Sequence, residues 1–280
     1  MLSSRALLVM ASIGFASMFG ATTLLASPIV GGIGGTPFLA NDDGSYPANG
    51  LNAGTPPGTP VAQPLGFTFN FFGTNYTTAY INNNGNITFN VPQSTFTPFA
   101  ITGATGNPLI APFFADVDTR VGPIVNFGTG TFSGHSAFAV NWPGVGYFAE
   151  HIDKTDTFQL LLVDRSDVAA GDVDFYFNYG SMQWETGDAS GGVGGLGGTC
   201  ARAGFNNGTG TSIEIPGSGT CGALIDGGAH QLLTATNDGV PGQFLFQVRG
   251  GQVINLPEPA GLALLLTGLV GLGLTRRQRG

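Results

Sequence analysis

Short apolar runs that alternate with polar residues, each closed by glycine, asparagine or proline, constrain this chain's fold more than any other feature. No internal stretch carries the apolar period of a long helix, and 47 of the 280 residues are glycine. The clearest run places Phe67, Phe69 and Phe71 on one face of an extended strand, with polar residues between them. Many short strands separated by turn residues predict an all-β chain, folded as a β-sandwich-like domain with glycine-rich loops.

Asparagine and glycine mark the turns between the predicted strands. The NNNG sequence at 82–85 predicts a tight turn, because Asn and Gly tolerate positive φ, and it makes 76–81 and 86–90 a hairpin. Further strands are predicted at 109–118, 136–142, 157–163 and 173–178, with weaker ones at 182–184, 201–205 and 243–249. The glycine run at 192–197 matches the dinucleotide fingerprint formally. More glycine follows where that fingerprint requires a helix, so we interpret 187–198 as a loop.

Both ends of the chain are apolar and must be set apart from the folded body. Arg5 is the only charge before Asp42, and a run of apolar and then small residues follows it, which predicts a secretory signal helix over 1–26. A second apolar run at 260–274 predicts a short transmembrane helix. At ~1.5 Å per residue it reaches only ~22 Å, less than the ~30 Å of a bilayer core. The arginines that follow it should stay on the cytoplasmic side, so the body lies on the other side.

Between these ends we expect an arm rich in Gly, Pro and Asn at 27–64, the β domain at 65–249 and a linker at 250–256. Without the terminal charges the body carries a net charge near −11. Nucleic acid is therefore not an expected partner, because phosphate binding requires a basic surface. Cys200 and Cys221 are expected to form a disulfide, since export places them in an oxidising compartment. Closing a loop of about 20 residues contributes roughly 3 kcal/mol.

The carboxylates at 116–118 are the best metal candidates in the sequence. On a continuous strand, Asp116, Asp118 and Arg120 share one face. Two alternatives follow: Arg120 pairs with these carboxylates, or Asp116 and Asp118 contribute to a Ca²⁺ site, although calcium takes six or more ligands. No other cofactor is predicted.

Catalysis has little support in the sequence. The three histidines are widely spaced, and no nucleophile elbow is present. A glycosidase needs only two carboxylates at the right separation, so Glu150, Glu185 and Glu214 stay open as an alternative. Trp142 and Trp184 are candidates for stacking on sugar rings, although such aromatics also fill cores.

Several short motifs in sequence order resemble the nidogen-type extracellular domain, NIDO. They are NNNGNITF at 82–89, IAPFFADVDTR at 110–120, NWPGVGYF at 141–148, TFQL at 157–160, QWETG at 183–187 and AGFNNG at 203–208. Together they span roughly 65–219. The resemblance implies an extracellular module linked to cell–matrix adhesion, and it brings no catalytic residues.

The C-terminus resembles a second family, the PEP-CTERM sorting signal, through Pro257, Glu258 and Pro259, the apolar segment and the arginine cluster at 257–280. That resemblance implies a Gram-negative bacterium, processing by an exosortase-type membrane peptidase and transfer to the outer surface. The resulting expectation is a non-enzymatic surface or matrix protein that associates with an envelope or matrix protein or with exopolysaccharide. A carbohydrate-binding module is the first alternative and a glycosidase the second.

Overall fold

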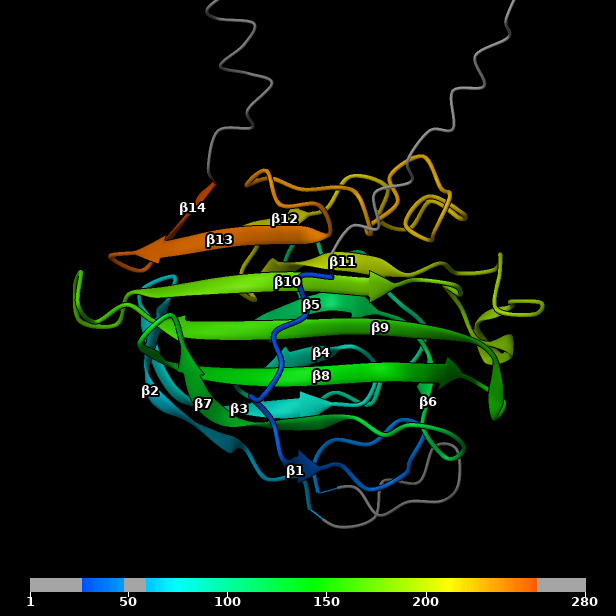
Figure 1. The fold of residues 1–280 in the computed structure, drawn as a ribbon, viewed down its shortest axis with the longest axis horizontal. Helices are drawn as coiled ribbons and strands as arrows, with labels where there is room; N and C mark the ends of the chain where they lie inside the picture. Colours follow the sequence, from blue (N-terminus) through cyan, green and yellow to red (C-terminus); the bar gives the residue numbers. More distant parts are fainter. Residues whose placement is uncertain (1–26, 48–58, 256–280) are drawn as a thin grey trace, which may run out of the picture.

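The computed structural model describes residues 27–47 and 59–255, and these form two antiparallel sheets packed face to face (Figure 1). Apart from one short 3₁₀ turn, η1 (Asp188–Ser190), every regular element in this part of the chain is a strand. The all-β, sandwich-like prediction is therefore confirmed. The predicted signal helix, transmembrane helix and sorting motif lie outside the described residues. Within them, no helix has the length and apolarity that crossing a bilayer takes.

The larger sheet forms the front layer of Figure 1. Its strands follow the order β1 (Thr36–Pro37), β7 (Asn126–Phe132), β8 (His135–Tyr147), β9 (His151–Asp164), β10 (Val173–Ser181), β13 (Gln243–Arg249) and β14 (Gln252–Asn255), and β6 (Val117–Asp118) pairs with β8. The second sheet lies behind it, in the order β12 (Ser212–Glu214), β11 (Arg202–Asn206), β5 (Leu109–Phe114), β4 (Asn86–Thr88), β3 (Thr74–Asn82) and β2 (Gln63–Phe71).

Alternating side chains from both sheets fill the space between the layers. Phe69 and Phe71 of β2 are buried as their spacing predicts. Phe175 of β10 meets Phe205 of β11 edge-on with ring centroids 5.4 Å apart, so the two layers touch through aromatic rings. Burial of a phenylalanine side chain contributes about 1.5–3 kcal/mol, so this aromatic layer stabilises the sandwich.

A row of amide side chains crosses the outer face of the larger sheet in register. Asn126, Asn141, Gln159, Asn178 and Gln243 occupy paired positions on β7, β8, β9, β10 and β13. From Asn141 onward, each side-chain amide nitrogen donates to the side-chain oxygen of the preceding member of this row, over 2.7–2.8 Å. This amide ladder ties five strands together side by side.

The start of the described chain lies across this ladder, as the dark blue segment in front of β10, β9 and β8 in Figure 1. Val30 donates its backbone N–H to Gln159 Oε1 over 3.1 Å and accepts from Gln159 Nε2 over 2.8 Å. Asn141 Nδ2 donates to the Ile33 carbonyl over 3.0 Å, and Ile33 packs on a small apolar cluster of β8 and β9. The expected arm at 27–64 is therefore packed onto the sandwich over residues 27–47.

Three other expectations about local structure differ from the structure. The strand expected at 109–118 is two strands, β5 and β6, which belong to different sheets. Residues 182–184 form no strand, because the backbone N–H groups of Gln183 and Trp184 donate to the Asp156 carboxylate instead of to a neighbouring strand. The linker expected at 250–256 contains β14, which pairs with β13 after the turn at Gly250 and Gly251.

Candidate functional site

The hairpin turn at 82–85 lies at the centre of the most polar buried region. Gly85 adopts φ 74°, and a Cβ there would lie 1.6 Å from the Phe113 carbonyl oxygen, so only glycine fits. Asn83 uses its side-chain amide to donate to the carbonyls of Asp42 and Val117. The turn thus joins β5 and β6 to a loop of the N-terminal segment.

That loop, residues 41–46, wraps around the turn through backbone bonds. Asn83 N donates to the Gly44 carbonyl over 2.9 Å, and Tyr46 N donates to the Ile81 carbonyl over 2.9 Å. Asn41 and Thr119 bond in both directions, since Asn41 N donates to Thr119 Oγ1 over 3.1 Å and Thr119 N donates to the Asn41 carbonyl over 2.9 Å. These contacts fix the backbone position of the two aspartates that follow Asn41.

Asp42 and Asp43 meet Asp116 at this point and form a cluster of three buried carboxylates. One oxygen from each residue lies within 4.8 Å of the others. Asp42 and Asp116 are each 1% exposed and Asp43 is 8% exposed, so the cluster approaches the surface at Asp43. Asn84 Nδ2 donates to Asp43 Oδ1 over 3.0 Å. Among the described residues, neither carboxylate oxygen of Asp42 or Asp116 has a hydrogen-bond partner.

Burial is the main reason why two of these carboxyls hold protons more tightly than usual. It raises the pKa of Asp116 to about 8, and the charges of Asp43 and Asp42 add to the effect. Burial also raises the pKa of Asp42 to about 7, with Asp43 and Asp118 adding to it and Arg120 opposing it. Three carboxylates this close either share protons or require a positive charge between them.

Asp118, the partner of Asp116 in the predicted calcium pair, lies in a different environment. Its carboxylate accepts from Arg120 Nε over 2.9 and 3.1 Å and from the Arg120 guanidinium terminus, and Glu150 N donates to it over 2.8 Å. The chain bends at Ala115, between β5 and β6, and the carboxylates of Asp116 and Asp118 have different neighbours. Asp116 and Asp118 therefore do not form a calcium pair with each other. Asp118 forms an ion pair with Arg120, and Asp116 lies in a cluster with Asp42 and Asp43.

The structure also corrects the sugar-stacking expectation for the two tryptophans. Trp142 and Trp184 are both fully buried. Trp142 stacks on Phe158 at 4.7 Å, and its indole N–H donates to the Asn83 carbonyl over 2.8 Å. The Trp184 indole donates to the Val145 carbonyl over 3.0 Å. Neither ring is available to a sugar, because both fill the core and use their polar atom to bond backbone.

The three candidate glutamates are held in separate structural contacts. Glu150 is exposed and lies 3.7 Å from Arg120, and Glu214 accepts from Arg202 over 2.9 Å. Glu185 is buried, and its two oxygens accept backbone N–H groups of Gly197 (3.3 Å) and Gly222 (2.7 Å). Each of the three is thus engaged with an arginine or with backbone N–H groups.

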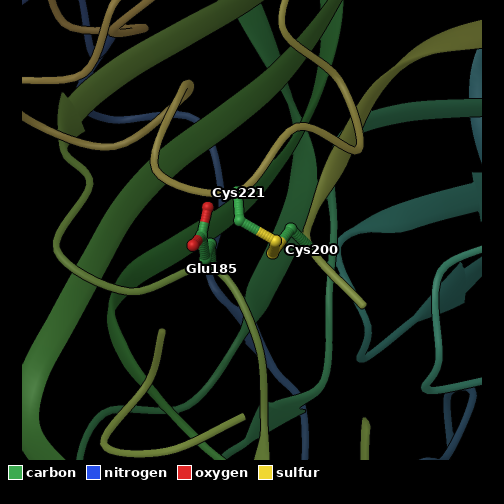
Figure 2. A group of neighbouring side chains, drawn as sticks. All are labelled: Glu185, Cys200 and Cys221. Atoms are coloured by element: carbon green, nitrogen blue, oxygen red, sulfur yellow. A yellow bond between two sulfur atoms is a disulfide. The ribbon is translucent and has the colours of Figure 1, made fainter. Parts of the chain in front are cut away.

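Glu185 lies beside the disulfide between Cys200 and Cys221, with its carboxylate next to the bridge (Figure 2). The predicted disulfide is confirmed, and because both sulfurs are bonded to each other they are not metal ligands. Glu185 and the bridge together hold two turns, one before Cys200 and one after Cys221. The glycine run at 192–197 forms part of the first, with a single bridge between Val193 and Leu196 and no helix after it.

Asp42 and Asp43 are the site residues that sequence reasoning missed. They follow a stretch with a single charge and stand inside a segment rich in glycine and proline, which predicts a loose arm. The adjacent pair of acids itself was the available signal, since two neighbouring carboxylates in an otherwise uncharged segment are unusual.

Comparison with known proteins places these observations in a family. The family model described as the nidogen-like domain matches residues 77–128 and 124–250. The chain is similar to alpha-tectorin of Homo sapiens, 36% identical over 208 residues, which is 65% of this chain and 9% of that protein. It is 32% identical to alpha-tectorin of Gallus gallus over 225 residues, 71% of this chain and 10% of that one. It is 30% identical to nidogen of Drosophila melanogaster over 214 residues, 67% of this chain and 14% of the relative.

The chain thus spans about a tenth of the length of these curated relatives. No solved structure matches it.

Proposed function

The chain belongs to the nidogen-like domain family, and from that premise we propose that it is an exported, non-enzymatic surface or matrix protein that works by adhesion. The observation that carries the proposal is the family match over 77–250, which covers most of the β-sandwich. The family implies an extracellular module linked to cell–matrix adhesion. Similarity to alpha-tectorin and nidogen supports the same role.

The chemistry of the described residues agrees with a binding or structural role. Trp142 and Trp184 serve the core, Glu185 and Glu214 bond backbone or arginine, and the disulfide is suited to an oxidising compartment. We propose in addition that the chain is a bacterial envelope or biofilm protein, sorted through the PEP-CTERM-like segment at 257–280 by an exosortase-type peptidase. Its partner is then an envelope or matrix protein or exopolysaccharide.

Localisation and attachment test this proposal in the organism that encodes the chain. Cells that produce the chain are compared with cells from which its gene has been deleted and with a complemented strain. We expect protease treatment of intact cells to remove the chain, and we expect the deletion strain to attach less to a surface or to its own matrix. Complementation should restore attachment.

Purified secreted chain is then applied to a glycan array and to envelope proteins separated from the same organism. Binding to an envelope protein with no glycan bound supports adhesion through protein. Binding of the chain to a glycan would instead indicate that it is a carbohydrate-binding module. Release of reducing sugar from any glycan, or a chain that stays protected inside intact cells, would contradict the proposal.

A further inference from the structure

We propose that Asp42, Asp43 and Asp116 bind one Ca²⁺ ion, which joins the N-terminal segment to the junction between β5 and β6. The three carboxylates come from two segments far apart in the sequence, and folding brings one oxygen of each within 4.8 Å of the others. This inference goes beyond the adhesion role, since it concerns what holds the domain together.

The unpartnered oxygens of Asp116 point to a ligand independently of the cluster's acidity. Asp116 is 1% exposed, and neither of its oxygens has a hydrogen-bond partner among the described residues. Both carboxylate oxygens of Asp42 are likewise buried without a hydrogen-bond partner among the described residues. Buried carboxylate oxygens are almost always bonded, and an uncompensated buried charge costs several kcal/mol. A cation that receives these oxygens removes that cost.

Among the described residues, the cations near Asp42 and Asp116 do not neutralise these two carboxylates. Arg120 is the nearest one, and its guanidinium is held by Asp118 and approaches Asp42 only to 3.7 Å. The same arginine lies 3.7 Å from Glu150. One positive charge is thus shared among several carboxylates, and Asp116 forms no ion pair with a described residue of the chain.

The donor set favours Ca²⁺ over other metals. All three ligands are carboxylates, and the cluster contains no histidine or cysteine, so soft-metal chemistry is disfavoured. Carboxylates bind calcium through one or both oxygens, so three of them supply between about three and six of the six to eight ligands it takes. Mg²⁺ is less suited because it retains its water shell and demands near-octahedral geometry. Asp43, the most exposed of the three, gives water access to the remaining positions.

Gly187 keeps the space beside Asp116 open. A Cβ at this position would lie 2.4 Å from Asp116 Oδ2 and 2.8 Å from Phe148 Cβ. Its φ of −96° suits any residue, so the requirement for glycine here is one of space. Gly187→Ala therefore disturbs the site while leaving all three carboxylates in the chain.

Thermal unfolding and calorimetry of the full mature chain test the proposal, after EGTA treatment and removal of the chelator. We expect one Ca²⁺ per chain with a dissociation constant of about 10⁻⁴–10⁻³ M, the range of extracellular calcium modules. At 10 mM CaCl₂ the melting temperature should rise by roughly 5 °C. MgCl₂ should give a much smaller rise.

The variant Asp116→Asn distinguishes two interpretations of the cluster, a calcium site and a group of carboxyls neutralised by protons. We expect this variant to melt above the native chain in EGTA, because folding no longer has to bury or protonate this carboxylate, and below it in CaCl₂, because the ion is lost. Asp167→Asn, at an exposed carboxylate that follows β9, should respond to calcium like the native chain. Gly187→Ala should weaken binding at least about tenfold.

A native chain with the same melting temperature in EGTA and in CaCl₂ would overturn the proposal. So would an Asp116→Asn variant that keeps the full calcium response. If Asp116→Asn does not fold, Asp43→Asn replaces it with the same expected loss of response, and the native titration decides independently of either variant.

Discussion

At the scale of single residues, the buried acids are the most informative feature of this chain. Asp118 and Asp174 are buried with arginine partners, since Asp174 accepts from Arg165 over 2.7 Å and Arg249 over 2.6 Å. Asp156 differs, because it is fully buried and its Oδ1 accepts only backbone N–H groups while Oδ2 has no partner among the described residues. An acid of this second kind is a source of pH dependence.

Asp156→Asn should raise stability at neutral and alkaline pH. Burial raises the pKa of Asp156 well above 3.8, and the nearby Asp226 and Glu185 add to the effect while the N–H groups of Gln183 and Trp184 oppose it. Above pH 4 the folded chain therefore binds a proton that the unfolded chain has lost, so the free energy of unfolding falls as pH rises. We expect the variant to gain about 1–3 kcal/mol at pH 8.

Urea unfolding at pH 4 and pH 8 measures the effect. The two chains should differ much less at pH 4, where Asp156 is neutral in the folded state and only about half ionised in the unfolded state. Asp153→Asn is the control, because Asp153 is exposed and its pKa is lowered by Tyr147 and Lys154. A gain that is equal at both pH values would show that the charge of Asp156 is not the cause.

At the scale of elements, the amide ladder explains how strands from β7 to β13 keep their register and how the N-terminal segment is held. Gln159 is its central member and uses its full hydrogen-bonding capacity, two donors and two acceptor positions. A one-residue slip of any of these strands would move its amide to the opposite face and break the row. The ladder therefore favours a single register.

Gln159→Leu should destabilise the chain and loosen the N-terminal segment. Leucine is close in size, but it leaves the partners on Val30, Asn141 and Asn178 without bonds in a buried position, at a cost of about 2–4 kcal/mol. Urea unfolding gives the cost, and hydrogen exchange over 28–36 should show faster exchange there than in the strands. Gln247→Leu on β13, outside the ladder, is the matched control and should change both measurements little. Equal effects of the two variants would argue against the ladder.

At the scale of the whole molecule, one aromatic core joins both sheets, and the disulfide with Glu185 secures the turns outside them. The described chain begins on the outer face of the larger sheet and ends in β14 at the far edge of the same sheet (Figure 1). The segment proposed for sorting therefore follows an edge strand of this sheet in the sequence.

If the C-terminal segment is sorted as proposed, the protein recovered from cells should lack the residues after about Pro259, because the proposed peptidase would cut near Pro257, Glu258 and Pro259 and remove the apolar segment and the arginines. Intact-mass measurement of the surface form checks this. Replacement of Arg276, Arg277 and Arg279 by glutamine should leave the tail on the chain, since it removes the charges proposed to hold the tail on the cytoplasmic side. A native surface form that retains Arg279 would reject the processing.

The fold class and most strand positions can be predicted from the sequence, because the two-residue alternation of a strand and the glycines and asparagines of its turns are local signals. The sequence also predicts the disulfide, since only two cysteines are present. Which distant side chains come into contact follows from the tertiary fold. Because the chain breaks between β5 and β6, Asp118 pairs with Arg120 while Asp116 lies beside Asp42 and Asp43. The packing of the two sheets buries both tryptophans. Such contacts depend on strand order and on the paths between sheets, which bring together residues distant in the sequence.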